Sequence, residues 1–385
     1  MLREEKTVML LLGIAHSMNH SLFLVLPPLL QNIAADLNMS FQTLGFIATI
    51  GFLIYGAGSL IGGPLSDVIG EMKVTRMGTA LSGLSTVIFL FSRDPSLFAV
   101  GMFIMSFWAS FYHPASNNLI LKLFKKNTGS MMGIHGAAGS IGQMFTPTLS
   151  YILGVLIDWR FAFFFFGVIS VLTALQMREI KFDREEPAGE KAGLFEIFKV
   201  HGLWIIYIYS IVGGLYGRGV ELFFPTFLRI SRGFTGELAA VSNSLVLLFG
   251  VVGQLLGGKA ADRFGPYKVV IASALGVTSS LFILMFTPIS EVGVTLFIII
   301  YGIFIFSNQP AMSTLIGQVS PKHLTGVAYG ITFFFAFGLG SVSTTIAGYL
   351  AEAFNLEIAF RCMFLFSILS LLVALTIPKF AKKET

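Results

Sequence analysis

Residues 62–73 form a polar segment between two apolar runs and read Gly62-Gly63-Pro64-Leu65-Ser66-Asp67-Val68-Ile69-Gly70-Glu71-Met72-Lys73. A second segment with the same pattern reads Gly257-Gly258-Lys259-Ala260-Ala261-Asp262-Arg263-Phe264-Gly265-Pro266-Tyr267-Lys268. Both follow Gly-Gly-x-x-x-Asp-x-x-Gly-x-x-Lys, and every shared residue is displaced by 195 positions, as from Gly62 to Gly257. A constant offset indicates that one half-molecule is used twice in the chain.

The repeat extends beyond these two segments. The pairs of matching stretches are Pro114-Ala115-x-x-x-Leu119-Ile120 with Pro310-Ala311-x-x-x-Leu315-Ile316, and Thr128-Gly129 and Gly133 with Thr325-Gly326 and Gly330. The offset drifts from 195 to 197 residues, as small insertions in loops would produce. Two parallel repeats of this kind are a known arrangement in secondary transporters.

The composition indicates a membrane protein. The 385 residues are 55% hydrophobic and 12% charged, with a mean hydropathy of +0.82, whereas soluble domains carry about 25% charged residues. The net charge of +5 comes from basic residues scattered between apolar runs, so we expect a lipid bilayer and no nucleic acid as the partner. The single cysteine, Cys362, excludes an intrachain disulfide and a thiolate metal cluster.

The apolar runs predict an all-α polytopic membrane protein with twelve transmembrane helices. The predicted spans are 8–30, 42–66, 74–92, 96–121, 127–156, 160–178, 203–228, 238–262, 268–287, 293–317, 325–350 and 359–378. The longest polar stretch follows the sixth span. We therefore expect an N-terminal six-helix bundle (1–178), a cytoplasmic linker (179–201) and a C-terminal six-helix bundle (202–385) related by pseudo-symmetry.

The distribution of lysine and arginine predicts the orientation in the membrane. Of the 25 basic residues, nineteen lie at the termini, in the linker or in loops on the same side as these. Five lie on the opposite side, namely Arg93, Arg160, Arg229, Arg232 and Arg361. The remaining one, Arg218, lies inside a span. Both termini are therefore predicted to be cytoplasmic, in a multi-pass protein of the inner (plasma) membrane.

The twelve spans, the central linker and the duplicated loop together resemble the major facilitator superfamily. Two motifs resemble more closely the branch of fosmidomycin-resistance-like drug:proton antiporters. They are His16-x-x-x-His20 with Leu26-Pro27-Pro28-Leu29-Leu30, and Phe111-Tyr112-His113-Pro114-Ala115-Ser116. The resemblance implies a substrate cavity lined by the first, fourth, seventh and tenth helices, which in this chain carry most of the intramembrane polar residues.

The seventh span holds two charges, Arg218 and Glu221, among four glycines. A charged side chain near the middle of a span costs about 2.5–3.5 kcal/mol on insertion scales. The two residues are three apart, so they share a helix face and can neutralise each other. A structural ion pair is one interpretation. The other, which we favour, is that they line the cavity and meet substrate or a proton.

The other candidate site residues lie on the first, fourth and tenth helices. They are His16, Asn19 and His20 on one stripe of the first helix, His113 and Asn117 on the fourth, and Asn308 and Gln309 on the tenth. The repeat places His20 opposite about Arg218 and aligns Gln309 with His113. We expect these side chains to bind substrate, with Glu221, His20 and His113 as proton carriers. His135 suits a cavity or a packing role equally.

The sequence predicts no metal site and no cofactor. His16 and His20 could share a transition metal, but such a site needs further ligands, no cysteine supplies one, and Glu221 and His113 are no more than candidates. No phosphate-binding Gly-x-x-x-x-Gly-Lys-Ser/Thr motif occurs, so an ATP-driven motor would be a separate chain. We expect no enzymatic activity.

The predicted function is secondary transport by a monomer that alternates access to one site. The first hypothesis is proton-coupled export of small amphipathic or anionic organic compounds. The alternative is a facilitator or importer of an organic-anion metabolite without proton coupling. A worn antiporter pattern, with Gly133 and Gly142 nine apart but Thr146 before Pro147, weakens the first, as does the lack of an arginine within the fourth helix. A non-transporting sensor is disfavoured by the short termini and linker.

The duplicated loop is interpreted as a gate. Its predicted gating residues are Gly63, Asp67, Gly70 and Lys73 in the first copy and Gly258, Asp262, Arg263 and Gly265 in the second. Each aspartate is expected near the N-terminus of a helix of the other half, at Thr325-Gly326 or Thr128-Gly129, where a carboxylate is favoured by about 0.3–1 kcal/mol when exposed. Asp67→Asn should then shift the population toward the inward-open state. The second copy is expected to keep more of the family's charge network.

Overall fold

The computed structural model describes residues 3–124, 128–177, 196–287, 291–321 and 325–381, which form helices joined by short loops, with no strand among them. The first half contains α1 (Arg3–Leu24), α2 (Leu26–Asp36), α3 (Phe41–Ile69), α4 (Glu71–Ser85), α5 (Val87–Phe91), α6 (Pro95–Ala109), α7 (Tyr112–Leu123), α8 (Thr128–Leu156) and α9 (Trp159–Gln176). We call residues up to 177 the N-terminal half and residues from 196 the C-terminal half.

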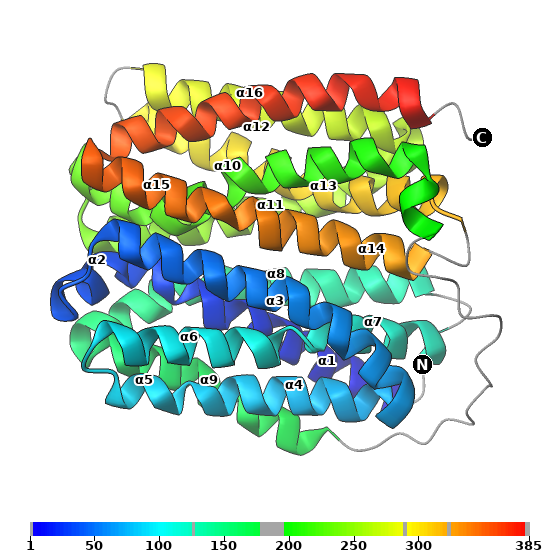
Figure 1. The fold of residues 1–385 in the computed structure, drawn as a ribbon, viewed down its shortest axis with the longest axis horizontal. Helices are drawn as coiled ribbons and strands as arrows, with labels where there is room; N and C mark the ends of the chain where they lie inside the picture. Colours follow the sequence, from blue (N-terminus) through cyan, green and yellow to red (C-terminus); the bar gives the residue numbers. More distant parts are fainter. Residues whose placement is uncertain (1–2, 125–127, 178–195, 288–290, 322–324, 382–385) are drawn as a thin grey trace.

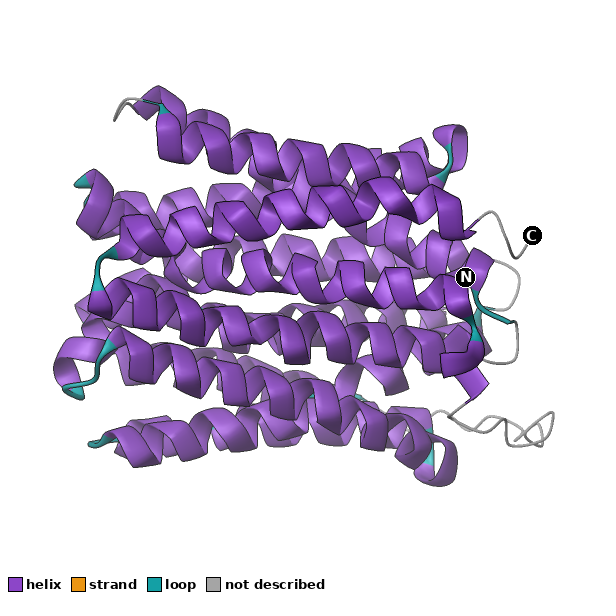
Figure 2. Cartoon of the chain, turned by 45° about the horizontal axis from the view of Figure 1, so that its top comes forward, coloured by secondary structure: helices purple, strands orange, loops and turns teal. Residues whose placement is uncertain are grey.

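The C-terminal half contains η1 (Glu196–Lys199), α10 (His201–Arg232), α11 (Gly236–Phe264), α12 (Pro266–Phe286), α13 (Glu291–Val319), α14 (Thr325–Phe333), η3 (Phe334–Gly338), η4 (Leu339–Ser341), α15 (Val342–Ala353) and α16 (Leu356–Ala381). The helices lie side by side, and both chain termini lie at the same end of the bundle (Figures 1 and 2). We call this end the terminal end and the opposite one the far end.

Each of the twelve predicted spans corresponds to a helix or to helices in succession. In the described part of the chain, eleven are long and apolar enough to cross a membrane. The twelfth predicted span is α8, whose 29 residues are also long enough to cross a bilayer. Its apolar character is diluted by buried polar residues such as His135 and Gln143. The prediction of an all-α polytopic membrane protein is confirmed.

Two of the spans are interrupted. The first span divides at Val25, because Pro27 and Pro28 fit the first turn of a new helix, α2, and not the interior of α1. The eleventh span is continuous in the sequence pattern but contains a π-helical turn, η3, followed by the 3₁₀ turn η4. Such turns are rare and often occur at functional sites.

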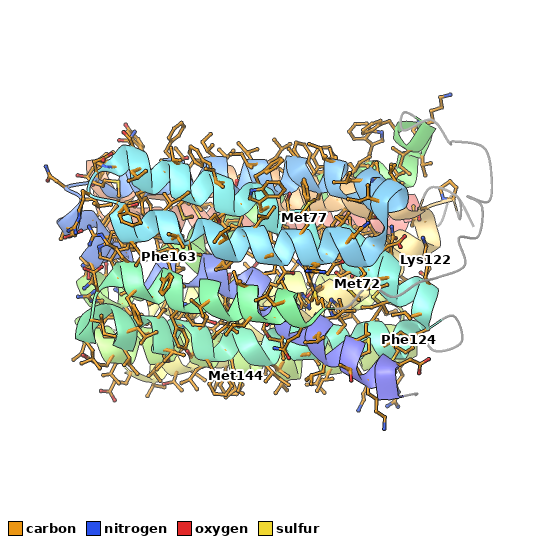
Figure 3. All side chains as sticks on the ribbon, turned by 90° about the horizontal axis from the view of Figure 1, so that it is seen from below. Met72, Met77, Lys122, Phe124, Met144 and Phe163 are labelled. Atoms are coloured by element: carbon orange, nitrogen blue, oxygen red, sulfur yellow. The ribbon has the colours of Figure 1, made fainter. Side chains whose placement is uncertain are left out.

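The outer surface is apolar, as contact with lipid requires. Exposed leucines, isoleucines, valines and phenylalanines occur along the whole length of the bundle, including Leu60, Leu84, Leu172, Leu256 and Phe282. Side chains on the face seen in Figure 3 are mostly carbon along the middle of the bundle. A water-soluble monomer rarely exposes so large an apolar area. The protein is therefore a multi-pass membrane protein.

The duplicated loop has the same backbone form in both copies. Gly70 has φ +102° and ψ 140°, and Gly265 has φ +91° and ψ 143°, which is a conformation that residues with a side chain rarely adopt. The Gly70 N–H donates to the Ser66 carbonyl, and the Gly265 N–H donates to the Ala261 carbonyl. Each glycine therefore separates two helices by a single residue. Gly70 lies between α3 and α4, and Gly265 lies between α11 and α12.

The glycine pair before each loop has a packing role. A Cβ on Gly63 would lie 3.6 Å from Pro114 Cβ, and one on Gly258 would lie 3.8 Å from Pro310 Cβ. Gly62 and Gly257 approach the backbones of Phe111 and Ser307 even more closely. The repeated Gly-Gly and Pro-Ala motifs are thus the two sides of one helix contact, α3 on α7 and α11 on α13.

The charges around the two loops differ between the copies. In the first copy, Lys122 of α7 forms an ion pair with the buried carboxylate of Glu71. In the second copy, Asp262 is exposed, Arg263 lies 5.2 Å from the ring of Phe264, and neither pairs with an opposite charge among the described residues. The side chains of Asp67, Thr128, Gly129, Thr325 and Gly326 lie outside the described part, so the aspartate latch stays a prediction.

The two halves contact each other mainly toward the far end. Thr49 of α3 donates to the Ser341 carbonyl at 2.9 Å, and the Thr344 hydroxyl donates to the Gly45 carbonyl at 2.8 Å. Further bonds join Thr148 to Ser244, Asn32 to Arg229 and the Phe41 N–H to Glu352. Among bonds between described residues, the one nearest the terminal end joins Ser140 and Gln254. The bundle is therefore closed at its far end.

A candidate substrate cavity between the two halves

A cavity of about 320 Å³ lies between the two halves, and we call it the main cavity. One wall comes from α1 and α8, with His16, His20, Ser140 and Gln143. The other comes from α10, α11, α13 and the α14–η3 segment. The lining continues to Met312, Ser313, Ile316 and Tyr329, beyond the last bond that joins the halves. The cavity therefore extends toward the terminal end.

Arg218 and Glu221 line this cavity and form an ion pair on one face of α10. Their side chains are about a quarter to a third exposed. Two glycines of α10 contribute to this exposure. A Cβ on Gly213 or Gly217 would meet no atom within 4 Å, so these residues leave open space beside the two charges.

The guanidinium group of Arg218 is also held by aromatic rings from both halves. Its central carbon lies 4.6 Å from the ring centre of Phe337 in η3 and 5.7 Å from that of Phe52 in α3. Cation–π contacts of this kind contribute about 0.5–2 kcal/mol each, depending on desolvation. The π-helical turn η3 contains Phe337, which gives that irregular segment a definite role at the site.

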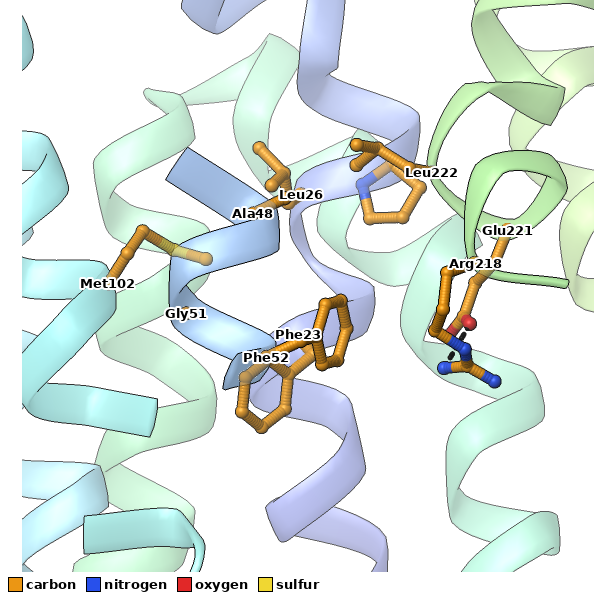
Figure 4. A pocket seen from close by; sticks show the side chains of 10 residues that line it. Phe23, Leu26, Ala48, Gly51, Phe52, Met102, Arg218, Glu221 and Leu222 are labelled. Carbon is orange, nitrogen blue, oxygen red and sulfur yellow. Dashed lines mark ion pairs between the residues drawn. The ribbon is translucent and has the colours of Figure 1, made fainter. Parts of the chain in front are cut away.

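The ion pair separates the main cavity from a small apolar pocket on its far-end side. This small pocket has a volume of about 20 Å³ and is lined by Phe23, Leu26, Ala48, Phe52, Met102 and others, together with Arg218 and Glu221 (Figure 4). In the close-up the side chains of Arg218 and Glu221 point toward each other. The pair thus forms a polar partition between the two cavities.

Six of the nine predicted substrate-binding residues line the main cavity. They are His16, His20, Arg218, Glu221, Asn308 and Gln309. Asn308 accepts a hydrogen bond of 3.0 Å from the Tyr209 hydroxyl. Gln309 accepts one of 2.8 Å from Gln254, whose own carbonyl accepts from Ser140 at 2.9 Å. These bonds connect α8, α11 and α13 across the cavity.

The other three predicted residues do not line the cavity. Asn19 is buried and uses its side chain internally, donating to the Ala109 carbonyl at 2.8 Å and accepting from the Tyr55 hydroxyl at 2.9 Å. Asn117 is partly buried and has no hydrogen bond among the described residues. His113 lies behind His16 and His20, with ring centres 5.0 and 5.1 Å from theirs. His135 is buried and stacks on His16 at 4.4 Å, which is a packing position.

Several lining residues were not predicted. Gln143, Asn243 and Gln254 are polar residues within apolar helices, so the signal that identified Arg218 was present. The resemblance, however, implied a cavity lined by the first, fourth, seventh and tenth helices, which do not include α8 and α11. The tyrosines Tyr209, Tyr216 and Tyr301 also line the cavity. Phe52 and Phe337 carry no sequence signal, because aromatic residues are abundant in every span and only the fold places these two beside Arg218.

Comparison with known proteins agrees with this architecture. The family model described as Major Facilitator Superfamily matches residues 9–345. The chain belongs to the Major Facilitator Superfamily. The gentisate transporter of Corynebacterium glutamicum is 25% identical over 90% of this chain and 82% of its own length. The fosmidomycin resistance protein of Escherichia coli is 23% identical over 92% and 89%. The structure of a D-xylose-proton symporter is similar, with a TM-score of 0.81, 16% identity and 97% coverage of both chains.

Family membership confirms two predictions made from the sequence. The resemblance to the major facilitator superfamily is correct, and the chain is a transporter and not an enzyme. A member of this superfamily binds a small molecule within its helix bundle. The chemistry of that molecule has to be inferred from the cavity.

Proposed function

We propose that this protein transports small organic anions by alternating access, with Arg218 as the group that binds the anion. The observation that carries the proposal is the position of Arg218 on the wall of both the main cavity and the small pocket. A site on both sides of a partition can be reached from each end in turn as the halves rock. An arginine presents its donors in a planar fork that suits carboxylate, phosphate and phosphonate groups.

The composition of the lining supports an anionic substrate. Arg218 is the only lysine or arginine among the described residues that line the main cavity. Tyr209, Asn308 and Gln309 supply hydrogen-bonding groups nearby, and Phe337 and Tyr216 supply aromatic surface. Two of the relatives are named for anionic compounds, since gentisate carries a carboxylate and fosmidomycin a phosphonate. An aromatic or short-chain organic acid fits this set of groups.

Glu221 gives the proposal a proton-coupling step. In this structure its carboxylate occupies the guanidinium group that a substrate anion would need. A proton on Glu221 removes the negative charge and frees Arg218, so proton and anion bind better together than separately. This coupling is reciprocal, because each ligand must raise the affinity for the other by the same factor. The pair therefore favours cotransport of anion and proton.

Export in exchange for protons is the second candidate, and the likeness to the fosmidomycin resistance protein favours it. Exchange requires proton and substrate to exclude each other. An anion that binds Arg218 does not compete with a proton on Glu221, whereas a cationic or zwitterionic substrate would. The direction in which protons move relative to the substrate distinguishes the two candidates.

The orientation of the cavity is part of the same proposal. Nineteen basic residues on the side of the termini and five on the other support cytoplasmic termini. The main cavity then extends toward the cytoplasm, and the closed far end faces outward. The conformation described is in that case inward-facing.

Counterflow in proteoliposomes tests the anion-binding role. Vesicles preloaded with an unlabelled organic acid should take up the labelled acid when they contain the wild-type protein. Arg218→Gln should reduce the initial rate at least tenfold, because the carboxylate loses its charged partner. Arg361→Gln, which removes an exposed arginine of α16, is the matched control and should transport normally. Equal rates for wild type and Arg218→Gln would exclude Arg218 as the anion site.

A further inference from the structure

Four of the six histidines of the chain lie together in the N-terminal half. His16 and His20 come from α1, His113 from α7 and His135 from α8, and we call them the histidine cluster. One nitrogen atom from each of His16, His20 and His113 can be chosen so that all three lie within 4.8 Å of one another. Their ring centres are 5.0–5.1 Å apart. The sequence offered His113 as a candidate ligand beside the pair on α1, and the fold brings its ring next to theirs.

Several nitrogen atoms of the cluster have no hydrogen-bond partner. Nε2 of His113 and both ring nitrogens of His135 are buried and unpaired within the described part of the chain. Buried polar atoms are nearly always paired, so three orphans in one cluster require an explanation. A ligand shared between the imidazole rings would supply the missing partner for His113.

The ring of His16 is oriented as in a metal site. Its Nδ1 lies 3.0 Å from the backbone carbonyl of His135, and only a protonated Nδ1 can donate to that oxygen. Nε2 of His16 then keeps its lone pair and is available as a ligand. Histidines that bind metals almost always donate their other nitrogen in this way, which fixes both the tautomer and the ring. Gly139 of α8 packs against the same ring, where a Cβ would lie 2.5 Å from Nδ1.

The cluster can be reached from the main cavity. His16 and His20 belong to its wall, whereas His113 lies behind them. An ion that enters the cavity would meet His20 first, with a fourth coordination position facing the open space. The charge of Arg218, on the opposite wall, is neutralised by Glu221.

We propose that His16, His20 and His113 form a binding site for one transition-metal ion of the zinc type on the N-terminal wall of the cavity. Three neutral imidazoles with an open fourth position match the ligand set of Zn²⁺ sites that keep an exchangeable position. Nitrogen ligands without thiolates suit Zn²⁺, Co²⁺ and Ni²⁺ better than calcium or magnesium. Tetrahedral ligand nitrogens are about 3.3 Å apart, from metal–nitrogen distances of about 2.0–2.1 Å. In the structure the three nitrogens lie within 4.8 Å of one another, so they have to move closer together when the ion binds.

Metal binding by the purified full-length protein tests this proposal without any transport assay. The protein would be purified through a tag without histidine and dialysed against Co²⁺ or Zn²⁺. We expect one equivalent of bound metal and, for Co²⁺, the visible absorption of a tetrahedral complex. His16→Asn and His113→Asn should each weaken binding at least tenfold. His201→Asn, which removes an exposed histidine at the start of α10, is the matched control and should bind as the wild type does.

Two results would contradict the proposed metal site. One is the absence of stoichiometric binding at micromolar Zn²⁺ and Co²⁺, which would leave the cluster as a set of proton carriers. The other is binding that is lost in His201→Asn or unchanged in His16→Asn, which would place the metal elsewhere. Thermal unfolding of each variant without metal identifies any that fail to fold, and His113→Gln then replaces His113→Asn. The anion proposal rests on Arg218, so either proposal can fail while the other stands.

Discussion

At the scale of single residues, Glu221 and Arg218 decide the proposed chemistry. Each is costly inside a membrane on its own, and each is stabilised by the other. The proposed site has two states with the same net charge. In one state Glu221 pairs with Arg218, and in the other a proton binds Glu221 and an anion binds Arg218. A change at either residue should therefore alter coupling and not only affinity.

Glu221→Gln should separate anion movement from proton movement. The amide cannot take up a proton, and it leaves Arg218 permanently available to an anion. We expect counterflow of the anion to continue within about threefold of the wild-type rate, while a pH gradient no longer accelerates net uptake. Glu291→Gln, at the exposed start of α13, is the control and should keep its response to pH. A pH-gradient response that survives in Glu221→Gln would assign the proton to another group.

Asn19→Ala should destabilise the fold and leave the chemistry of the cavity unchanged. The substitution leaves the buried Ala109 carbonyl and Tyr55 hydroxyl without their partner, which costs about 1–3 kcal/mol for a buried group. The melting temperature in detergent, followed by tryptophan fluorescence, should fall clearly. Asn117→Ala removes an asparagine without such bonds and should melt like the wild type. Equal melting of the two variants would contradict the structural role of Asn19.

At the scale of elements, α10 and the α14–η3–η4–α15 segment form the site together. The π-helical turn places Phe337 beside Arg218, and η4 brings Gly340 against Gly214 of α10. The Gly214 contact is so close that a Cβ would overlap the Ala336 carbonyl and lie 2.6 Å from Gly340 Cα. The glycines of α10 therefore serve two purposes, with Gly214 for packing and Gly213 for space.

Gly214→Ala and Gly213→Ala should differ in stability although they are neighbours. Overpacking at Gly214 is expected to cost about 1–3 kcal/mol. The added methyl group at Gly213 meets no atom and gains up to about 1 kcal/mol of helix propensity. Thermal unfolding of both variants in the same detergent checks this difference. A Gly214→Ala variant as stable as Gly213→Ala would show that α10 and η4 do not pack as described.

At the scale of the whole molecule, the two ends of the bundle differ. The hydrogen bonds of Thr49, Thr148 and Asn32 close the far end, and the main cavity runs toward the terminal end. Alternating access would require these bonds to break and new contacts to form at the duplicated loops. The predicted aspartate latch belongs to that second state.

Thiol labelling should report this asymmetry. In a Cys362→Ser background, Ser313→Cys places a thiol on the exposed part of the cavity wall, and Thr345→Cys places one at the closed far end. A membrane-impermeant maleimide should label Ser313→Cys from the cytoplasmic side at least tenfold faster than it labels Thr345→Cys from outside. Labelling of Ser313→Cys from outside alone would reverse the predicted orientation.

The architecture could be predicted from the sequence, because the internal duplication and the long hydrophobic runs can be read directly from it. Gly70 and Gly265 could be recognised from their spacing, and Arg218 and Glu221 from their cost in a span. The sequence did not reveal that Asn19 is used internally, that His113 joins His16 and His20, or that Phe337 covers Arg218. These facts depend on rotations of helices and on a π-helical turn, which hydrophobic periodicity does not encode.

Proton movement driven by an organic anion tests the central claim most directly. Proteoliposomes with a pH-sensitive dye inside and no initial pH gradient would receive an organic acid such as gentisate outside. The claim predicts that the interior acidifies with the wild-type protein, does not acidify with Glu221→Gln, and shows neither uptake nor acidification with Arg218→Gln. Alkalinisation during anion uptake by the wild type, or acidification that persists in Glu221→Gln, would contradict it.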